Sequence, residues 1–331
     1  MIFKQLLDEW LEFIKGNIKP RTFITYESTV RLHISQYLGA LNVTDIDKFK
    51  IRDFFEFAAA KRNEKNKPSL SPSSLRLIER ILHLVVGYSE GLIDADLMTK
   101  AKRLIKKHCK ADMHNDVDIA CAFDKDAQRK IVEYYYAKGR KQDIGILIAL
   151  YTGLRIGEVL ALEWDDIDFE TGLLKIHKSA YYCKLQSDDD NECRYALLDC
   201  TPKSKSSYRT IALPSGLLEL LKLHSKNSLS KYIVTKPNGK RIPTHSYQYA
   251  FKAILKKCEI NYGSFHTLRH TFATRAIELG ADIKTISECL GHQSAGFTLN
   301  RYIHSMLDSK KMLAGQIDKV YWDEDANNED N

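Results

Sequence analysis

The stretch Thr152-Gly153-Leu154-Arg155-Ile156-Gly157-Glu158 marks a change of local structure in the second half of the chain. The mostly apolar residues 143–150 before it predict a helix, and Thr152-Gly153 ends that helix because glycine commonly closes helices. Arg155 then begins another helix, which we expect to reach Trp164. An arginine at the beginning of a helix is usually a solvated charge, so this stretch alone assigns no activity.

Helices and short strands surround this stretch from Asp124 onward. Apolar spacing and helix-ending residues predict further helices at 127–137, 214–226, 244–258, 266–279 and 282–290, with Ser264 available to cap the fourth and Gly280 to end it. Branched and aromatic residues favour strands at 173–182, 195–201 and 208–213. The polar turn 203–207 before the last strand predicts a small antiparallel sheet with Lys205 at a hairpin tip.

The first hundred residues predict helices. Apolar residues recur at three- and four-residue steps on one helical face at Phe3, Leu6, Leu7, Trp10, Leu11 and Ile14. Three more helices are expected within 20–38, 45–60 and 73–88, and a polar, lysine-rich stretch separates the last two. This pattern predicts a compact four-helix unit and says nothing more about its role.

Length and composition bound the class of protein. A chain of 331 residues with 44% hydrophobic content is long enough for about two domains at roughly 150 residues each. The uncharged run from Ile144 to Leu154 has eleven residues, whereas a membrane-spanning helix needs roughly 20. Lys4, Asp8 and Glu9 interrupt the apolar core that a secretory signal requires. We therefore expect a cytoplasmic protein with no membrane partner.

Cysteines and charge narrow the possible partners. The seven cysteines form no C-x-x-C pair, so the sequence suggests neither a disulfide framework nor a zinc ribbon. The net charge of +7 suits a polyanion without proving one. A basic segment at 100–110 and the polar residues after it predict an interdomain connection, which is either a solvated helix end or a strap against DNA. Its basic residues include Lys102, Arg103, Lys106 and Lys107.

Two histidines allow a metal hypothesis that their neighbours weaken. His266 and His270 have the i, i+4 spacing at which two imidazoles can bind one zinc ion. Thr267 stands where a metalloprotease carries its glutamate base, and the cationic Arg269 lies between the two histidines. We expect no metal site here, and His270 more often packs or bonds locally in such a pattern.

The joint order of several short motifs is more informative than any one of them. In chain order these are Thr152–Glu158, Lys205, His266-Thr267-Leu268-Arg269-His270, Leu290-Gly291-His292 and Tyr302. From about residue 120 to 305 this order resembles the tyrosine recombinase (phage integrase) family. The resemblance implies a mainly α fold with a small antiparallel β-sheet. It also implies a helical core-type DNA-binding domain at 1–100 and an α+β catalytic domain at 119–322. The basic and polar residues between them predict a linker at 101–118, and the acidic, polar residues 323–331 predict a disordered tail.

The chemistry of DNA strand transfer needs these residue types. A tyrosine can hold the phosphate as a covalent ester, which gives Tyr302 the role of nucleophile. Two guanidiniums, from Arg155 and Arg269, can bind the charged oxygens of the transition state without a metal ion. A lysine can give the leaving 5′-oxygen a proton. The resemblance assigns that role to Lys205, with Lys203 as the nearby alternative.

The resemblance assigns the remaining site residues as well. His266 assists proton transfer, His292 donates a hydrogen bond to a phosphate oxygen, and Glu158 lies one helical turn from Arg155 to orient the cations. DNA contacts are expected from Lys102, Arg103, Lys106, Lys107, Lys203 and Arg209. After Tyr302, apolar residues up to Trp322 predict a docking segment that packs either on a neighbouring subunit or on its own chain.

The sequence thus predicts a site-specific recombinase of a mobile element that works through a 3′-phosphotyrosine and a Holliday junction, without ATP or a cofactor. Its expected partners are double-stranded DNA core sites, three further copies in a homotetramer, and accessory DNA-bending or directionality proteins. The alternative within the class is a Xer-like chromosome-dimer resolvase or a DNA invertase, because the chain begins almost directly with the helical domain. A zinc hydrolase, a relaxing topoisomerase and a catalytically silent DNA-binding regulator are the rivals outside it.

Overall fold

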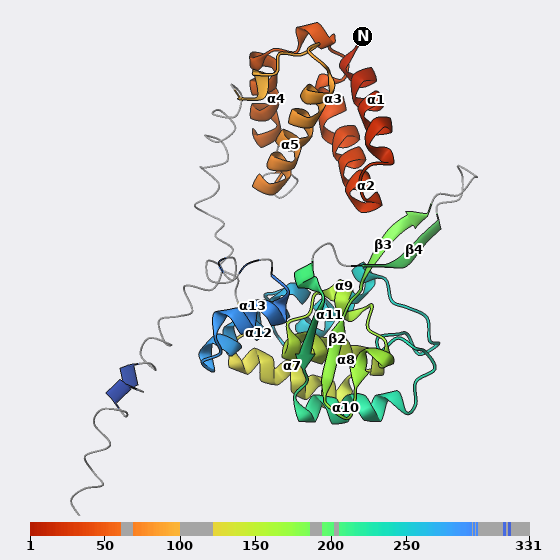
Figure 1. Cartoon of the computed structure of the whole chain (residues 1–331), viewed down its shortest axis with the longest axis vertical. Helices are drawn as coiled ribbons and strands as arrows, with labels where there is room; N and C mark the ends of the chain where they lie inside the picture. Colours follow the sequence, from red (N-terminus) through yellow and green to blue (C-terminus); the bar gives the residue numbers. More distant parts are fainter. Residues whose placement is uncertain are drawn as a thin grey trace, which may run out of the picture. The chain divides into compact units, whose positions relative to one another are not determined.

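The computed structural model describes residues 1–60, 69–99, 122–185, 194–201 and 205–292, together with residues 294, 296, 314, 315, 317 and 318. The chain divides into two compact units, Met1–Ile119 and Ala120–Asn331, and each is described by itself. Figure 1 shows helices in both units and strands in the second. Within the described ranges, no helix is long and apolar enough to cross a membrane.

Unit 1 is helical, as predicted. Its elements are α1 (Phe3–Lys15), α2 (Pro20–Thr29), the π-helical turn η1 (Val30–Ile34), α3 (Ser35–Leu38), the 3-10 turn η2 (Val43–Asp45), α4 (Lys48–Ala60) and α5 (Pro72–Tyr88). The apolar face of α1 is buried, which confirms the helical spacing of Phe3 to Ile14. The segment predicted as one helix over 20–38 contains a π-helical turn between α2 and α3.

The helices of unit 2 include one that is buried along almost its whole length. They are α7 (Lys125–Lys138), η3 (Lys141–Asp143), α8 (Ile144–Thr152), α9 (Ile156–Val159), η4 (Trp164–Asp166), α10 (Ser215–Ser225), α11 (Thr244–Lys257), α12 (Phe265–Glu278) and α13 (Ile283–Leu290). Residues 144–150 of α8 are all buried, so this helix is the centre of the core. The helix predicted from Arg155 to Trp164 is wrong in length. It ends at Val159, and Leu162 beyond it accepts a hydrogen bond from Ile233 N–H.

The strands form two antiparallel sheets. The first has the order β1 (Ile167–Asp168), β2 (Leu173–Ile176), β5 (Arg209–Ala212), with Leu174 opposite Ile211. The second pairs β3 (Ser179–Leu185) with β4 (Arg194–Cys200), and Figure 1 shows this pair projecting from the rest of unit 2. The predicted strand 173–182 is therefore two strands in different sheets. Lys178 between them is held by Glu163 at 2.9 Å, where the chain leaves the first sheet.

The predicted hairpin tip at Lys205 is a further correction. Strands β4 and β5 do not pair with each other in the described sheets, because β4 pairs with β3 and β5 pairs with β2. Lys205 instead begins a 3-10 turn, η5 (Lys205–Ser207), on the connection between the two sheets. The polar sequence of the turn was recognised from composition, but strand partners are long-range contacts that a local pattern does not contain.

The first described residues of unit 2 are fastened to α12. The backbone N–H of Phe123 donates to Thr271 Oγ1 at 2.8 Å, and its carbonyl accepts from Arg275 Nη2 at 2.9 Å. The Phe123 ring is fully buried. Gly263, at φ +95°, makes room for that ring, because a Cβ there would lie 2.6 Å from Phe123 Cε1. The chain thus enters unit 2 along the helix that carries His266 and Arg269.

Candidate active site

Arg155 and Glu158 form the first part of the candidate site, at the start of α9. Arg155 is the N-cap residue of this short helix. Glu158 Oε2 accepts from the Arg155 backbone N–H at 2.9 Å, and its Oε1 accepts from Arg155 Nη1 at 2.9 Å. A carboxylate at this position satisfies a backbone donor that the helix leaves unbonded. It also holds the guanidinium, whose side chain remains 39% exposed and accessible to a ligand.

Arg209 on β5 is the second partner of Glu158. Its Nη2 lies 2.8 Å from Glu158 Oε2, and its Nη1 donates to Oε1 at 3.2 Å. Burial by itself would raise the pKa of Glu158. The hydrogen bond and charge of Arg209, with those of Arg155, outweigh burial and lower this pKa below its ordinary value. Glu158 is therefore a carboxylate at neutral pH and neutralises part of the charge of the two arginines.

The structure corrects the predicted DNA contact of Arg209. Its side chain is 5% exposed, and its Nε donates to the Cys289 carbonyl at 2.6 Å. All three nitrogens of this buried guanidinium bond protein acceptors, so its donors are committed to Glu158, Cys289 and Ser207 rather than to DNA. The alternation of β5 contained the signal, because Arg209 is two residues from the buried Ile211 and so shares its face of the sheet.

Arg269 and the two histidines lie on α12. Arg269 is 2% exposed, and its Nη1 donates to the Gly153 carbonyl at 2.9 Å. His266 is exposed one turn earlier, and the edge of its ring meets the buried His270 ring with centroids 4.6 Å apart. Ser264 is the N-cap residue of this helix, as predicted, and the hydroxyl of Thr267 accepts from its backbone N–H at 2.9 Å.

Gly153 connects the two arginines. Its carbonyl binds Arg269, and it stands two residues before Arg155. Its φ of +68° is in the left-handed region that favours glycine, and a Cβ there would lie 2.6 Å from Phe272 Cδ1 and 2.8 Å from Leu290 Cδ2. The sequence predicted Gly153 as the end of α8. The structure adds that this residue allows α8, α12 and α13 to approach one another.

The end of α13 brings His292 to the same place. Gly291 closes this helix at φ +63°, and its carbonyl accepts from Arg155 Nη2 at 3.4 Å. A Cβ on Gly291 would lie 3.0 Å from Arg209 Nη1 and 3.1 Å from the Ser206 carbonyl. His292 follows and is partly exposed. The turn that begins at Lys205 therefore packs against the residue before His292.

The other predicted site residues are placed only in part. The backbone of Lys205 is described, at the start of η5, whereas its side chain is not. The predicted nucleophile Tyr302 lies outside the described residues. The same holds for most of the predicted docking segment and for the linker and turn residues Lys102, Arg103, Lys106, Lys107 and Lys203.

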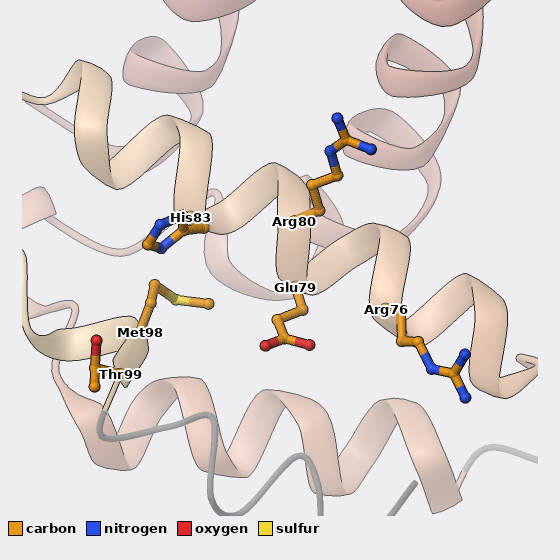
Figure 2. A pocket seen from close by; sticks show the side chains of 6 residues that line it. All are labelled: Arg76, Glu79, Arg80, His83, Met98 and Thr99. Carbon is orange, nitrogen blue, oxygen red and sulfur yellow. The ribbon is translucent and has the colours of Figure 1, made fainter. Parts of the chain in front are cut away.

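A pocket elsewhere contains none of the predicted residues. It lies in unit 1, has a volume of about 240 Å³, and is shown in Figure 2. Its lining comprises Arg76, Glu79, Arg80, His83, Met98 and Thr99. In Figure 2, the Arg80 side chain points away from Glu79 and Met98. The side chains of this pocket do not converge on one point, so the candidate site is the cluster in unit 2.

The arrangement in unit 2 is suited to binding an oxyanion. Arg155 and Arg269 are fixed by the protein, and arginine keeps its charge at any working pH. The partly exposed His292 and the exposed His266 supply imidazole nitrogens that can donate or accept hydrogen bonds. Fixed donors aimed at a developing negative charge are the arrangement that stabilises a phosphoryl transition state.

Comparisons with known proteins match a family model to each of the two units. The model of the Phage integrase family matches residues 122–308, and that of the Phage integrase, N-terminal SAM-like domain matches residues 2–57. A relative named "Tyrosine recombinase XerC-like", from Caldanaerobacter subterraneus subsp. tengcongensis, is 29% identical over 96% of this chain and 82% of its own length.

Two solved structures share the fold. One is the Tn1549 transposon integrase in complex with a circular intermediate DNA. It has a TM-score of 0.74 and 19% identity, and the match covers 96% of this chain and 99% of that one. The other is the lambda integrase tetramer bound to a Holliday junction, with a TM-score of 0.62, 18% identity, and coverage of 89% and 78%. The mainly helical fold with small antiparallel sheets is thus confirmed.

Proposed function

The chain belongs to the phage integrase family of tyrosine recombinases, which are DNA strand transferases, and we propose that its own reaction uses Tyr302 as the nucleophile. The observation that carries this proposal is the linkage of Arg155, Arg269 and the residue before His292 through the carbonyls of Gly153 and Gly291. Residues that are far apart in sequence meet in one oxyanion-binding cluster, in the motif order that the family uses.

The proposed reaction is two successive transesterifications. The Tyr302 hydroxyl attacks the phosphorus, the bond to the 5′-oxygen breaks, and a 3′-phosphotyrosine forms. Lys205 gives a proton to the leaving 5′-oxygen, and His266 assists proton transfer at the attacking side. Arg155, Arg269 and His292 bind the non-bridging oxygens. A 5′-hydroxyl then attacks the phosphotyrosine in reverse, so the ester energy is kept and neither ATP nor a metal ion is required.

We propose double-stranded DNA core sites as the substrate and a homotetramer at a Holliday junction as the working assembly. The fold shared with the DNA-bound Tn1549 integrase and the lambda integrase tetramer supports both. Integration and excision of a mobile element is the favoured use, in the cytoplasm and with accessory DNA-bending or directionality proteins. The XerC-like relative supports chromosome-dimer resolution as the alternative. The domain roles follow the boundaries 1–100, 101–118, 119–322 and 323–331.

A covalent trapping assay tests the reaction. Nicked duplexes from the DNA that flanks the gene are incubated with protein in chelator, and the products are run on a denaturing gel. We expect a DNA-linked band with wild type and with Tyr249→Phe, a control at a tyrosine that is 70% exposed, and no band with Tyr302→Phe. Tight binding without a band in wild type would support the silent regulator instead. A band that needs added metal would contradict the mechanism.

Salt dependence tests the extended DNA contact. If about six phosphates are neutralised, binding falls on the order of a thousandfold between about 50 and 200 mM salt. The measurement is a binding titration of the full chain on a duplex that gives the covalent band. A flat response over this range would exclude a protein that wraps a core site.

A further inference from the structure

Arg209 bonds three segments that carry different parts of the proposed site. It holds Glu158 on α9 by two contacts, at 2.8 and 3.2 Å. Its Nε donates to the Cys289 carbonyl near the end of α13, at 2.6 Å. Its Nη1 also donates to the Ser207 carbonyl in the Lys205 turn, at 3.2 Å. Glu158 lies three residues after Arg155, and Cys289 lies three residues before His292. Ser207 lies two residues after Lys205.

The packing around Arg209 leaves little freedom. The side chain is 5% exposed, and a Cβ on the nearby Gly291 would lie only 3.0 Å from Arg209 Nη1. A guanidinium has five donors in a fixed plane and can bind three acceptors at fixed angles. A lysine has one flexible ammonium and cannot reproduce that fork. The chemistry at this position therefore calls for arginine rather than for a positive charge alone.

We propose that Arg209 is a positioning residue, which holds Arg155, the Lys205 turn and the His292 loop in one arrangement through its bonds to Glu158, Ser207 and Cys289. Arg209 does not contact DNA in this account. The inference rests on the proposed function, because it describes how the residues of that reaction are kept in register. Misplacement of reacting groups by about 1 Å is enough to cost on the order of a hundredfold in rate.

Loss of Arg209 also changes the charge on Glu158. Within the part of the chain that the structure describes, the charged or titratable groups that face this carboxylate are Arg155 and Arg209, with Cys289 nearby on α13. Burial raises the pKa of the Cys289 thiol, so it adds no negative charge at neutral pH. Without Arg209, burial raises the pKa of Glu158 against Arg155 alone. Glu158 is then protonated, and no longer holds Arg155 by its charge, at a pH where Glu158 of the wild type is still a carboxylate.

The experiment compares Arg209→Ala and Arg209→Lys with wild type. Single-turnover cleavage of nicked duplex is measured from pH 5 to 8 at saturating protein, with binding and thermal unfolding measured in parallel. Arg241→Ala is the matched control, because Arg241 is also largely buried, pairs with Asp199 and donates to the carbonyls of Leu197 and Leu160. Glu158→Gln, alone and combined with Arg209→Ala, tests whether the two residues act as a unit.

We expect Arg209→Ala to bind DNA within about threefold of wild type and to cleave about ten to a hundred times more slowly at pH 7. Its rate should fall further as the pH drops, with a midpoint at higher pH than in wild type. Glu158→Gln should remove this pH dependence. In the double variant with Arg209→Ala, it should reduce the cleavage rate little further than Arg209→Ala does alone. Arg209→Lys should be intermediate, and Arg241→Ala should keep the wild-type pH profile.

Three outcomes would overturn the inference. One is wild-type cleavage by Arg209→Ala or, if that variant does not fold, by Arg209→Lys. A second is a loss of cleavage rate in Arg209→Ala that is the same at every pH and that multiplies with the loss caused by Glu158→Gln in the double variant. That result would leave Arg209 with a purely structural role. The third is weaker DNA binding by Arg209→Ala together with a wild-type cleavage rate at saturating protein. That result would support the DNA contact that the sequence predicts for Arg209. A wild type that forms no Tyr302-dependent band would refute the proposed function separately.

Discussion

The two arginines that we assign to the phosphate are held by different means. Arg155 is 39% exposed and is held by the carboxylate of Glu158, itself bound to the buried Arg209. Arg269 is 2% exposed and bonds the backbone carbonyl of Gly153 from inside the core. One end of the site thus depends on opposite charges, and the other on close packing between α8, α12 and α13.

This difference means that the two arginines assigned to the phosphate should be sensitive to different kinds of substitution. The α9 end should respond to pH and to changes of charge, because a carboxylate titrates. The α12 end should respond to changes of volume, because close-packed interiors do not accommodate extra atoms. Both guanidiniums are held by protein hydrogen bonds, but Arg155 is partly exposed whereas Arg269 is enclosed by the core. The following variants test this contrast.

Removing either guanidinium should have the largest effect on activity and should separate the two ends by stability. Arg155→Ala and Arg269→Ala should each slow single-turnover cleavage by about 10² to 10³-fold, the cost of one transition-state donor. Arg269→Ala should also lower the free energy of unfolding by about 2–4 kcal/mol, because it empties a buried site. Arg155→Ala should change it by less than about 1 kcal/mol. Equal losses of stability would contradict the contrast.

Gly153→Ala should damage the packed end without removing any charge. The left-handed backbone costs about 1–2 kcal/mol for alanine. The contacts with Phe272 and Leu290 add about 1–3 kcal/mol. We expect a loss of about 2–4 kcal/mol in denaturant unfolding, together with lower cleavage. The control is Gly216→Ala, where a Cβ meets nothing within 4 Å and stability should stay within about 0.5 kcal/mol. Equal effects of the two substitutions would refute the packing argument.

Titration of Glu158 should affect the charged end alone. Although burial opposes ionisation, Arg209 and Arg155 lower the folded-state pKa below the ordinary value of 4.5. The stabilisation from the carboxylate is therefore present above about pH 4.5 and is lost as the pH falls through the folded-state pKa. In urea unfolding from pH 3 to 7, the advantage of wild type over Glu158→Gln should shrink at acid pH. The deficit of Gly153→Ala should remain constant. An advantage of wild type over Glu158→Gln that stays constant down to pH 3 would be inconsistent with this view.

The smallest effect is expected where the chain joins α12. Thr271→Val leaves the buried Phe123 N–H without its acceptor, which costs about 1–2 kcal/mol. Cleavage should fall only a few-fold, because Arg269 keeps its bond to Gly153. Thr210→Val is the control, since Thr210 is exposed on β5 and should change stability by less than about 0.5 kcal/mol. The measurement is thermal unfolding of both variants. If Thr271→Val lowered the free energy of unfolding as much as Gly153→Ala, the hydrogen bond between Thr271 and Phe123, rather than the packing at Gly153, would hold α12 in place.

Local signals in the sequence predicted much of this fold. The apolar face of α1 and the glycines that close α8 and α13 depend on neighbours within a few residues, and the structure confirms them. The length of α9 and the division of 173–182 between two sheets were not predicted. Both are set by distant partners, such as Ile233 for Leu162 and Glu163 for Lys178.

The residue types of the candidate site and the contact between Arg155 and Glu158 were predicted, whereas its other connections were not. The order of motifs pointed to Arg155, Glu158, Arg269 and His292, and the structure links the segments that carry them. Arg209 was expected among the DNA contacts, but its side chain is 5% exposed. The alternation with Ile211 indicated the buried face, whereas the pairing of β5 with β2 that encloses it is a long-range contact.

The attachment of Phe123 to α12 has a consequence for protein engineering. A designer who fuses unit 2 to a DNA-binding domain from a different protein has to choose where one sequence stops and the other begins. A joint placed after Phe123 would discard a buried ring and two backbone hydrogen bonds to Thr271 and Arg275. A joint upstream of residue 122 keeps them. A chimera should therefore include Phe123 in the segment taken from unit 2 and begin the artificial linker before it.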